Sequence, residues 1–105
     1  MVGAYNFDAL EPCELPKEVD TGFTGVFSIF AGAEYTPVLY CGTQDVHGIN
    51  HMIICKMRIC HPDATDRPVK VVLNQMPIKE AVVFKGTSKD ELTSNWSIVS
   101  IEKIA

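Results

Sequence analysis

Apolar side chains recur along residues 16–31 at the spacing of one face of an α-helix. They are Val19, Phe23, Val26, Phe27 and Phe30. Pro16 suits a first helical turn, and Gly32 suits a C-terminal cap. The pattern therefore predicts one amphipathic helix over 16–31.

Two glycines, Gly22 and Gly25, interrupt this helical pattern. Each costs about 1 kcal/mol relative to alanine inside a helix. We expect them to let a curved sheet approach the helix closely.

The rest of the chain carries short, β-rich apolar runs separated by turn-forming residues. The runs cover residues 36–41, 51–60, 69–73, 81–84 and 96–104. The first two predict a long hairpin with its tip at Gln44–Gly48, and the composition of 61–68 predicts a turn. Residues 74–77 are expected to break the third strand, because Pro77 cannot donate to a ladder. One helix followed by consecutive strands predicts an α+β fold, with a four- or five-stranded antiparallel sheet wrapping the helix.

The 105 residues suit one domain over 1–105, with 1–15 as an extended N-terminal arm. Apolar residues make up 47% of the chain and charged residues 21%, which is ordinary for a globular protein. The net charge is −4 and no basic run occurs, so we expect no nucleic-acid partner and no anionic membrane partner. No apolar run reaches the roughly 18 residues that a membrane span needs. The N-terminus has no signal-peptide pattern, which predicts a cytoplasmic protein, or a secreted one if a signal was removed.

The cysteines invite a metal or thiol site. They are Cys13, Cys41, Cys55 and Cys60, which we expect to be reduced. Cys55 and Cys60 lie five residues apart on one predicted strand and so face opposite sides. No Cys-x-x-Cys pair occurs, and we therefore expect no metal and no cofactor.

A thiol enzyme would pair Cys41 with His51 across the hairpin. Nothing in the sequence places a helix N-terminus or positive charge beside that thiol to lower its pKa. The chain is therefore predicted not to be an enzyme, with a thiol enzyme or metal-binding protein kept as a minor alternative.

Val46 is an apolar residue on a predicted turn. An exposed apolar side chain at such a position does not stabilise the fold. It either meets a partner or folds back on its own sheet.

The tip, Gln44-Asp45-Val46-His47-Gly48, has the form Gln-x-Val-x-Gly and is followed by Ile49-Asn50-His51. This resembles the Gln-Val-Val-Ala-Gly signature of the cystatins, which inhibit papain-like cysteine proteases. Met76 and Pro77 stand where the stefin branch has its second hairpin loop. Gly3, preceded by an apolar residue, matches the glycine of the family's N-terminal arm.

The resemblance implies a wedge that enters a papain-like protease cleft. In that wedge Val46 fills an apolar depression, and Gly48 lets the backbone approach the cleft wall. Met76 and Pro77 add a second contact, and Gly3 lies in the substrate subsites.

Asp45 and His47 depart from the family pattern by adding charge and bulk at the tip. The alternative is a non-inhibitory cystatin-fold module for binding or dimerisation. We expect a monomer, with hairpin exchange as the route to a domain-swapped dimer.

Overall fold

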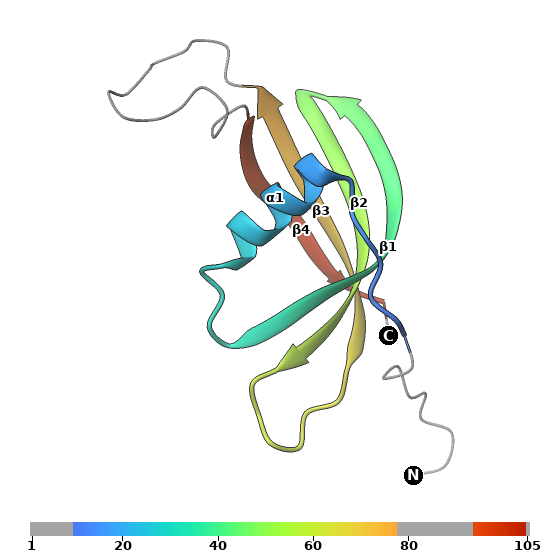
Figure 1. Cartoon of the computed structure of the whole chain (residues 1–105), viewed down its shortest axis with the longest axis vertical. Coiled ribbons are helices and arrows are strands. Elements are labelled where there is room, and N and C mark those ends of the chain that lie inside the picture. Colours follow the sequence, from blue (N-terminus) through green and yellow to red (C-terminus); the bar gives the residue numbers. More distant parts are fainter. Residues whose placement is uncertain (1–9, 78–93, 105) are drawn as a thin grey trace.

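The structure is a computed structural model that describes residues 10–77 and 94–104 (Figure 1). Its elements are α1 (Lys17–Phe27), β1 (Ala33–Val46), β2 (Gly48–Ile59), β3 (Arg67–Pro77) and β4 (Ser94–Lys103). The strands form one antiparallel sheet in the order β1-β2-β3-β4. The predicted α+β arrangement is confirmed, and the strand expected at 81–84 lies outside the described residues.

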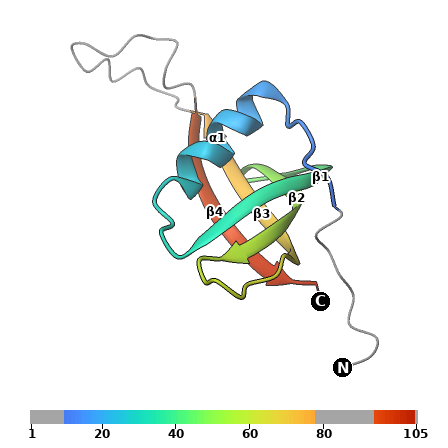
Figure 2. The ribbon, with the colours of Figure 1, turned by 60° about the horizontal axis from the view of Figure 1, so that its bottom comes forward.

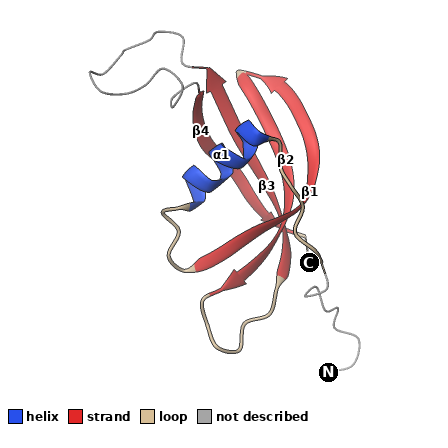
Figure 3. Ribbon diagram, in the orientation of Figure 1, coloured by secondary structure: helices blue, strands red, loops and turns tan. Residues whose placement is uncertain are grey.

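Helix α1 lies across one face of this sheet, which we call the inner face (Figure 3). Val19 and Phe23 are the buried apolar side chains of the helix. They pack on buried residues of β2 and β3: Ile53, Cys55, Val69, Val71 and Leu73. Strand residues alternate between faces, so the opposite, outer face carries the even-numbered side chains of β2 and β3.

Gly22 is the point of closest approach between helix and sheet. A Cβ built on it would overlap the indole ring of Trp96 in β4. The close approach expected of Gly22 is confirmed. The same expectation is wrong for Gly25, because a Cβ at that position would meet nothing within 4 Å.

The helix is shorter than the apolar pattern predicts. It ends at Phe27, with Ser28 as its cap, and Ser28 Oγ donates to the Gly25 carbonyl at 2.7 Å. Gly32 has no positive φ and is not the cap. Phe30 nevertheless continues the apolar cluster, since its ring lies 5.2 Å from that of Phe27 and 5.9 Å from that of Tyr35.

Strand β3 runs through the segment expected to break it. Residues 74–77 continue the ladder with β4, and Pro77, opposite Ser94, is the last residue of the strand. The missing N–H of Pro77 is tolerated at a strand end. Met76 and Pro77 are thus paired strand residues rather than members of a loop.

Two irregularities in β1 change which face its side chains occupy. The pairing with β2 shifts between Pro37 and Leu39 and again between Tyr40 and Gly42. Gly42 takes φ +124° at the second shift, a conformation that favours glycine. After these bulges Gly42 lies opposite Met52 and so shares the outer face with it.

Candidate functional site

The hairpin tip lies at the same end of the sheet as the end of β3 (Figure 1). Val46 and Gly48 are paired residues, with His47 between them. The Val46 side chain is 47% exposed, so it does not fold back fully onto its own sheet. The tip therefore presents an apolar side chain to solvent.

Gly48 has φ +86°, a backbone conformation that L side chains rarely adopt. A Cβ at this position would lie 2.5 Å from Met76 Sδ and 2.7 Å from the backbone oxygen of Gln75. The space beside Gly48 is thus filled by the chain's own β3. The absent Cβ brings Met76 against the hairpin tip.

Asn74 braces the same tip through its side-chain amide. Its Nδ2 donates to the carbonyl of His47 at 3.1 Å and to Oδ1 of Asn50 at 3.0 Å. Asn50 is the asparagine that follows the pentapeptide. These two bonds tie the turn to β3 and limit the freedom that the tip would lose on binding.

The register separates Asp45, but not His47, from the apolar residue of the tip, Val46. Gln44 pairs with Asn50 and Val46 with Gly48, so all four lie toward the outer face, as Met76 does. Asp45 pairs with Ile49 and therefore points to the inner face. His47 is exposed at the turn itself.

A buried histidine, His51, fixes the strands behind the tip. Its Nδ1 lies 2.7 Å from the Tyr40 hydroxyl, and its Nε2 lies 2.8 Å from Gln75 Oε1. Because an amide oxygen only accepts, the proton sits on Nε2 and Nδ1 accepts from Tyr40. The ring also lies 5.1 Å from that of Trp96.

The Gln75 amide extends this network to the helix. Its Nε2 donates to Ser94 Oγ at 3.0 Å and to Glu18 Oε2 at 3.4 Å. Residues from α1 and all four strands are thereby linked behind the tip.

The Cys41–His51 pair of the thiol-enzyme alternative is not assembled. His51 is 5% exposed and both its ring nitrogens are engaged by Tyr40 and Gln75, whereas Cys41 is exposed. Burial raises the pKa of the Cys55 thiol to about 12, with smaller contributions from Cys13 and Cys41. A raised pKa disfavours the nucleophilic thiolate.

All four cysteines are free thiols. Cys55 is buried in β2, whereas Cys60 is exposed and follows the end of that strand at Ile59, so the two do not share one strand as predicted. Within residues 10–77 and 94–104, no group of three or more His, Cys, Asp or Glu side chains is placed to hold a metal ion. In the same ranges, no helix has the length and apolar content to cross a membrane.

Gly3 lies outside the described residues, but the arm that leads to it is described from Leu10. The Leu10 carbonyl accepts from Lys56 Nζ at 2.9 Å.

Of the predicted site residues, the structure brings together Val46, His47, Gly48 and Met76. It adds Asn74 and Gln75, which the sequence pattern predicts to lie in a strand break. In the sequence, these two residues are consecutive amide side chains directly after the apolar run 69–73. Such a pair fits a turn and the end of a strand equally well, so the sequence pattern does not identify them as site residues.

Comparison with protein-family models, with curated proteins and with solved structures gave no match to this chain.

Proposed function

We propose that the chain is a reversible inhibitor of papain-like cysteine proteases with a cystatin-like fold. In this proposal the β1–β2 tip and the end of β3 enter the protease cleft together and block it without chemistry of their own. The arrangement of one helix and an antiparallel sheet supports the proposal, as does the Gln-x-Val-x-Gly sequence of the tip.

The observation that carries the proposal is the braced apolar edge made by Val46, Gly48 and Met76. Val46 is half exposed, Met76 is held beside Gly48, and Asn74 fixes the turn between them. Binding proteins gain affinity when the contacting residues are ordered before they meet the partner. An exposed valine beside a thioether offers that contact to an apolar depression.

The role proposed for Gly48 differs from the one the resemblance implies. Its missing Cβ is used inside the protein, where Met76 and the Gln75 carbonyl occupy the space. Gly48 thus shapes the edge rather than touching the cleft wall. Asp45 points to the inner face, away from Val46, which leaves His47 as the polar residue beside the apolar edge.

The test is a titration of papain with the purified chain, with residual hydrolysis of a fluorogenic peptide as the readout. We expect saturable inhibition by the wild type and at least about a tenfold loss with Val46→Asp, because a buried unpaired carboxylate is costly. Val99→Asp is the matched control, since Val99 is 55% exposed on β4 and away from the tip. No inhibition by the folded wild type at micromolar excess would refute the proposal.

The exposed His47 and the neighbouring Asp45 favour one alternative, a non-inhibitory module of the same fold. Such a module would leave papain active while the chain binds a different partner or a second copy. Light scattering over a concentration series tests the second copy: a mass that stays monomeric at every concentration excludes hairpin exchange.

A further inference from the structure

A hollow lies at the end of the sheet remote from the tip. It has a volume of about 500 Å³. Its principal side chains are Met57, Ile59, His61, Asp63, Arg67 and Lys103. They come from β2, the connection to β3, β3 itself and the end of β4, which lie at one end of the molecule (Figure 2).

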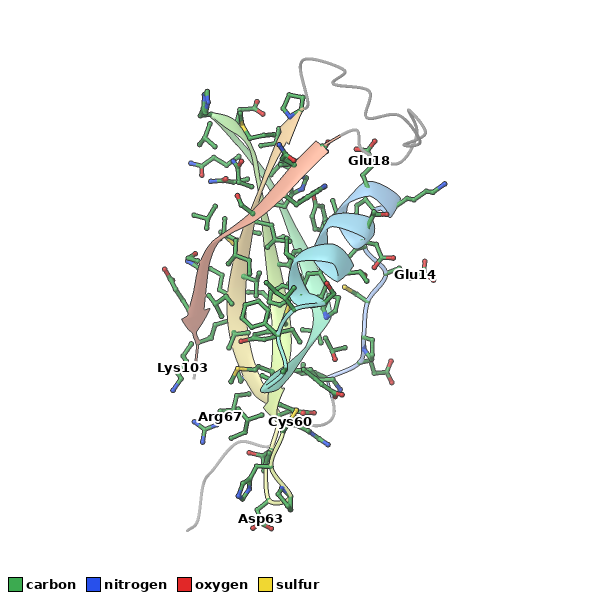
Figure 4. All side chains as sticks on the ribbon, turned by 90° about the vertical axis from the view of Figure 1, so that its left-hand side faces the viewer. Glu14, Glu18, Cys60, Asp63, Arg67 and Lys103 are labelled. Carbon is green, nitrogen blue, oxygen red and sulfur yellow. The ribbon has the colours of Figure 1, made fainter. Side chains whose placement is uncertain are left out.

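The sheet register brings two cations to the rim of this hollow. Arg67 lies directly opposite Met57, and Lys103 lies opposite Val69, two residues further along β3. Arg67 and Val69 share the inner face, so Lys103 reaches the same side. Figure 4 shows Arg67 and Lys103 at this end, with Asp63 on the connection.

Neither cation has a protein partner within residues 10–77 and 94–104. The acidic residues beside them in the sequence are engaged elsewhere: Asp66 Oδ1 lies 2.7 Å from Arg58 Nε, and Glu102 Oε2 lies 3.0 Å from Lys70 Nζ. Asp63 is the acidic residue in the lining. Two cations and one carboxylate give the lining a net charge of +1, which matches a single anionic group.

Met57 and Ile59 form the apolar part of the lining, and His61 and Thr65 add polar side chains. Met57 packs against the core, and Ile59 is 52% exposed above it. The connection is ordered by backbone bonds from Ala64 to His61 and from Cys60 to Gly32, each 3.0 Å long. A concave site with apolar walls and a few placed polar groups is the usual form of a small-molecule site.

We propose that this hollow binds a monoanionic amphiphile, a single carboxylate carried on an apolar chain. The Arg67 guanidinium takes the carboxylate by paired N–H donors, and Lys103 adds a second charge. The apolar chain lies on Met57 and Ile59. This site is separate from the hairpin tip, and the proposal stands whether or not the chain inhibits a protease.

The probe is decanoate, added below its micelle-forming concentration to the full ¹⁵N-labelled chain and followed by NMR amide shifts. We expect saturable shifts in residues 57–67 and around Lys103. Acetate, which lacks the apolar chain, and decyltrimethylammonium, which reverses the charge, should each bind at least about tenfold more weakly.

Arg67→Met keeps most of the side-chain stem and removes the charge, so we expect roughly tenfold weaker decanoate binding. Lys17→Met is the matched control, because Lys17 is an exposed lysine at the start of α1; its affinity should match the wild type. Equal affinity for the cationic probe, shifts centred on another surface, or unchanged affinity in Arg67→Met and in Lys103→Met would each overturn the proposal.

Discussion

The two ends of the sheet present opposite surfaces to a partner. At one end the β1–β2 tip and the end of β3 form a projecting edge, with Val46 and Met76 braced by Asn74. At the other end β2, β3 and β4 surround a hollow rimmed by Arg67 and Lys103. The first shape suits the cleft of another protein, and the second suits a small ligand.

The two ends differ in whether their polar side chains form hydrogen bonds or ion pairs within the protein. Behind the tip, His51 and Gln75 bond to other side chains and hold the edge rigid. At the hollow, Arg67 and Lys103 have no side-chain partner among the residues that the structure describes, so they are open to a ligand. One sheet can therefore carry a pre-ordered protrusion and an open site, and substitutions should affect them separately unless they disturb the core between them.

The largest expected effect comes from filling the contact between helix and sheet. Gly22→Ala places a methyl group on the Trp96 ring, and we expect a loss of about 2–3 kcal/mol in the free energy of unfolding. The substitution lies in the core between the two ends and should therefore weaken the support of both. Urea unfolding followed by Trp96 fluorescence measures this effect.

Gly25→Ala is the matched control, since nothing lies within 4 Å of its added methyl group. It should raise stability by about 0.5–1 kcal/mol through helix propensity. A Gly22→Ala variant as stable as Gly25→Ala would contradict the packing described for the helix.

A second, more local effect is expected from Gly48→Ala. The positive φ and the contact with Met76 and the Gln75 oxygen should together cost about 2 kcal/mol. Papain inhibition should fall while decanoate binding persists. Gly42→Ala, with φ +124° but open space around it, serves as a control for backbone strain alone and should cost less.

Removal of the Asn74 brace should act on the tip alone. Asn74→Ala loses two hydrogen bonds and should cost about 1–2 kcal/mol. Hydrogen exchange of the amides near the tip should speed up, and decanoate binding should not change. Thr24→Ala, at an exposed position of α1 away from the tip, should leave exchange at the tip as it is.

A smaller effect, spread over both ends, is expected at high pH. Burial raises the pKa of Cys55 to about 12 from a reference value of 9.0, and burial also raises the pKa of Tyr40. The unfolded chain loses the Cys55 proton first, so stability is full below pH 9 and falls as pH rises toward 12. The slope should approach about 1 kcal/mol per pH unit. Urea midpoints in Cys55→Ala should show a shallower slope, and those in Cys60→Ala an unchanged one.

The sequence predicts the parts of the fold that depend on periodic apolar spacing. Val19 and Phe23 mark the buried side of α1, and the apolar runs mark the strands around Ile53 and Val71. The end of the helix at Phe27 is set by local capping at Ser28, which periodicity does not encode. The extension of β3 through Pro77 depends on pairing with Ser94, a partner distant in the sequence.

The candidate site is harder to predict because its geometry depends on long-range contacts. Asp45 and Val46 lie on opposite faces because neighbouring strand residues alternate. Which of the two faces the helix depends on the pairing with β2 after the two bulges, and this pairing cannot be deduced from the sequence of β1 alone. Asn74 reaches His47 from another strand. Arg67 and Lys103 line the same hollow because β3 and β4 are neighbours in the sheet. These contacts join segments that are distant in the sequence, so the spacing of apolar residues within one segment does not predict them.

The proposal that the hairpin tip binds the protease is tested most directly by finding which end of the sheet contacts papain. The ¹⁵N-labelled chain would be mixed with papain whose active-site cysteine is blocked by a small group, and amide shifts would be recorded. We predict shifts at residues 44–50 and 74–77 and none around Arg67 and Lys103. Shifts confined to the hollow, or none at saturating papain, would contradict the assignment of the tip as the protease-binding edge.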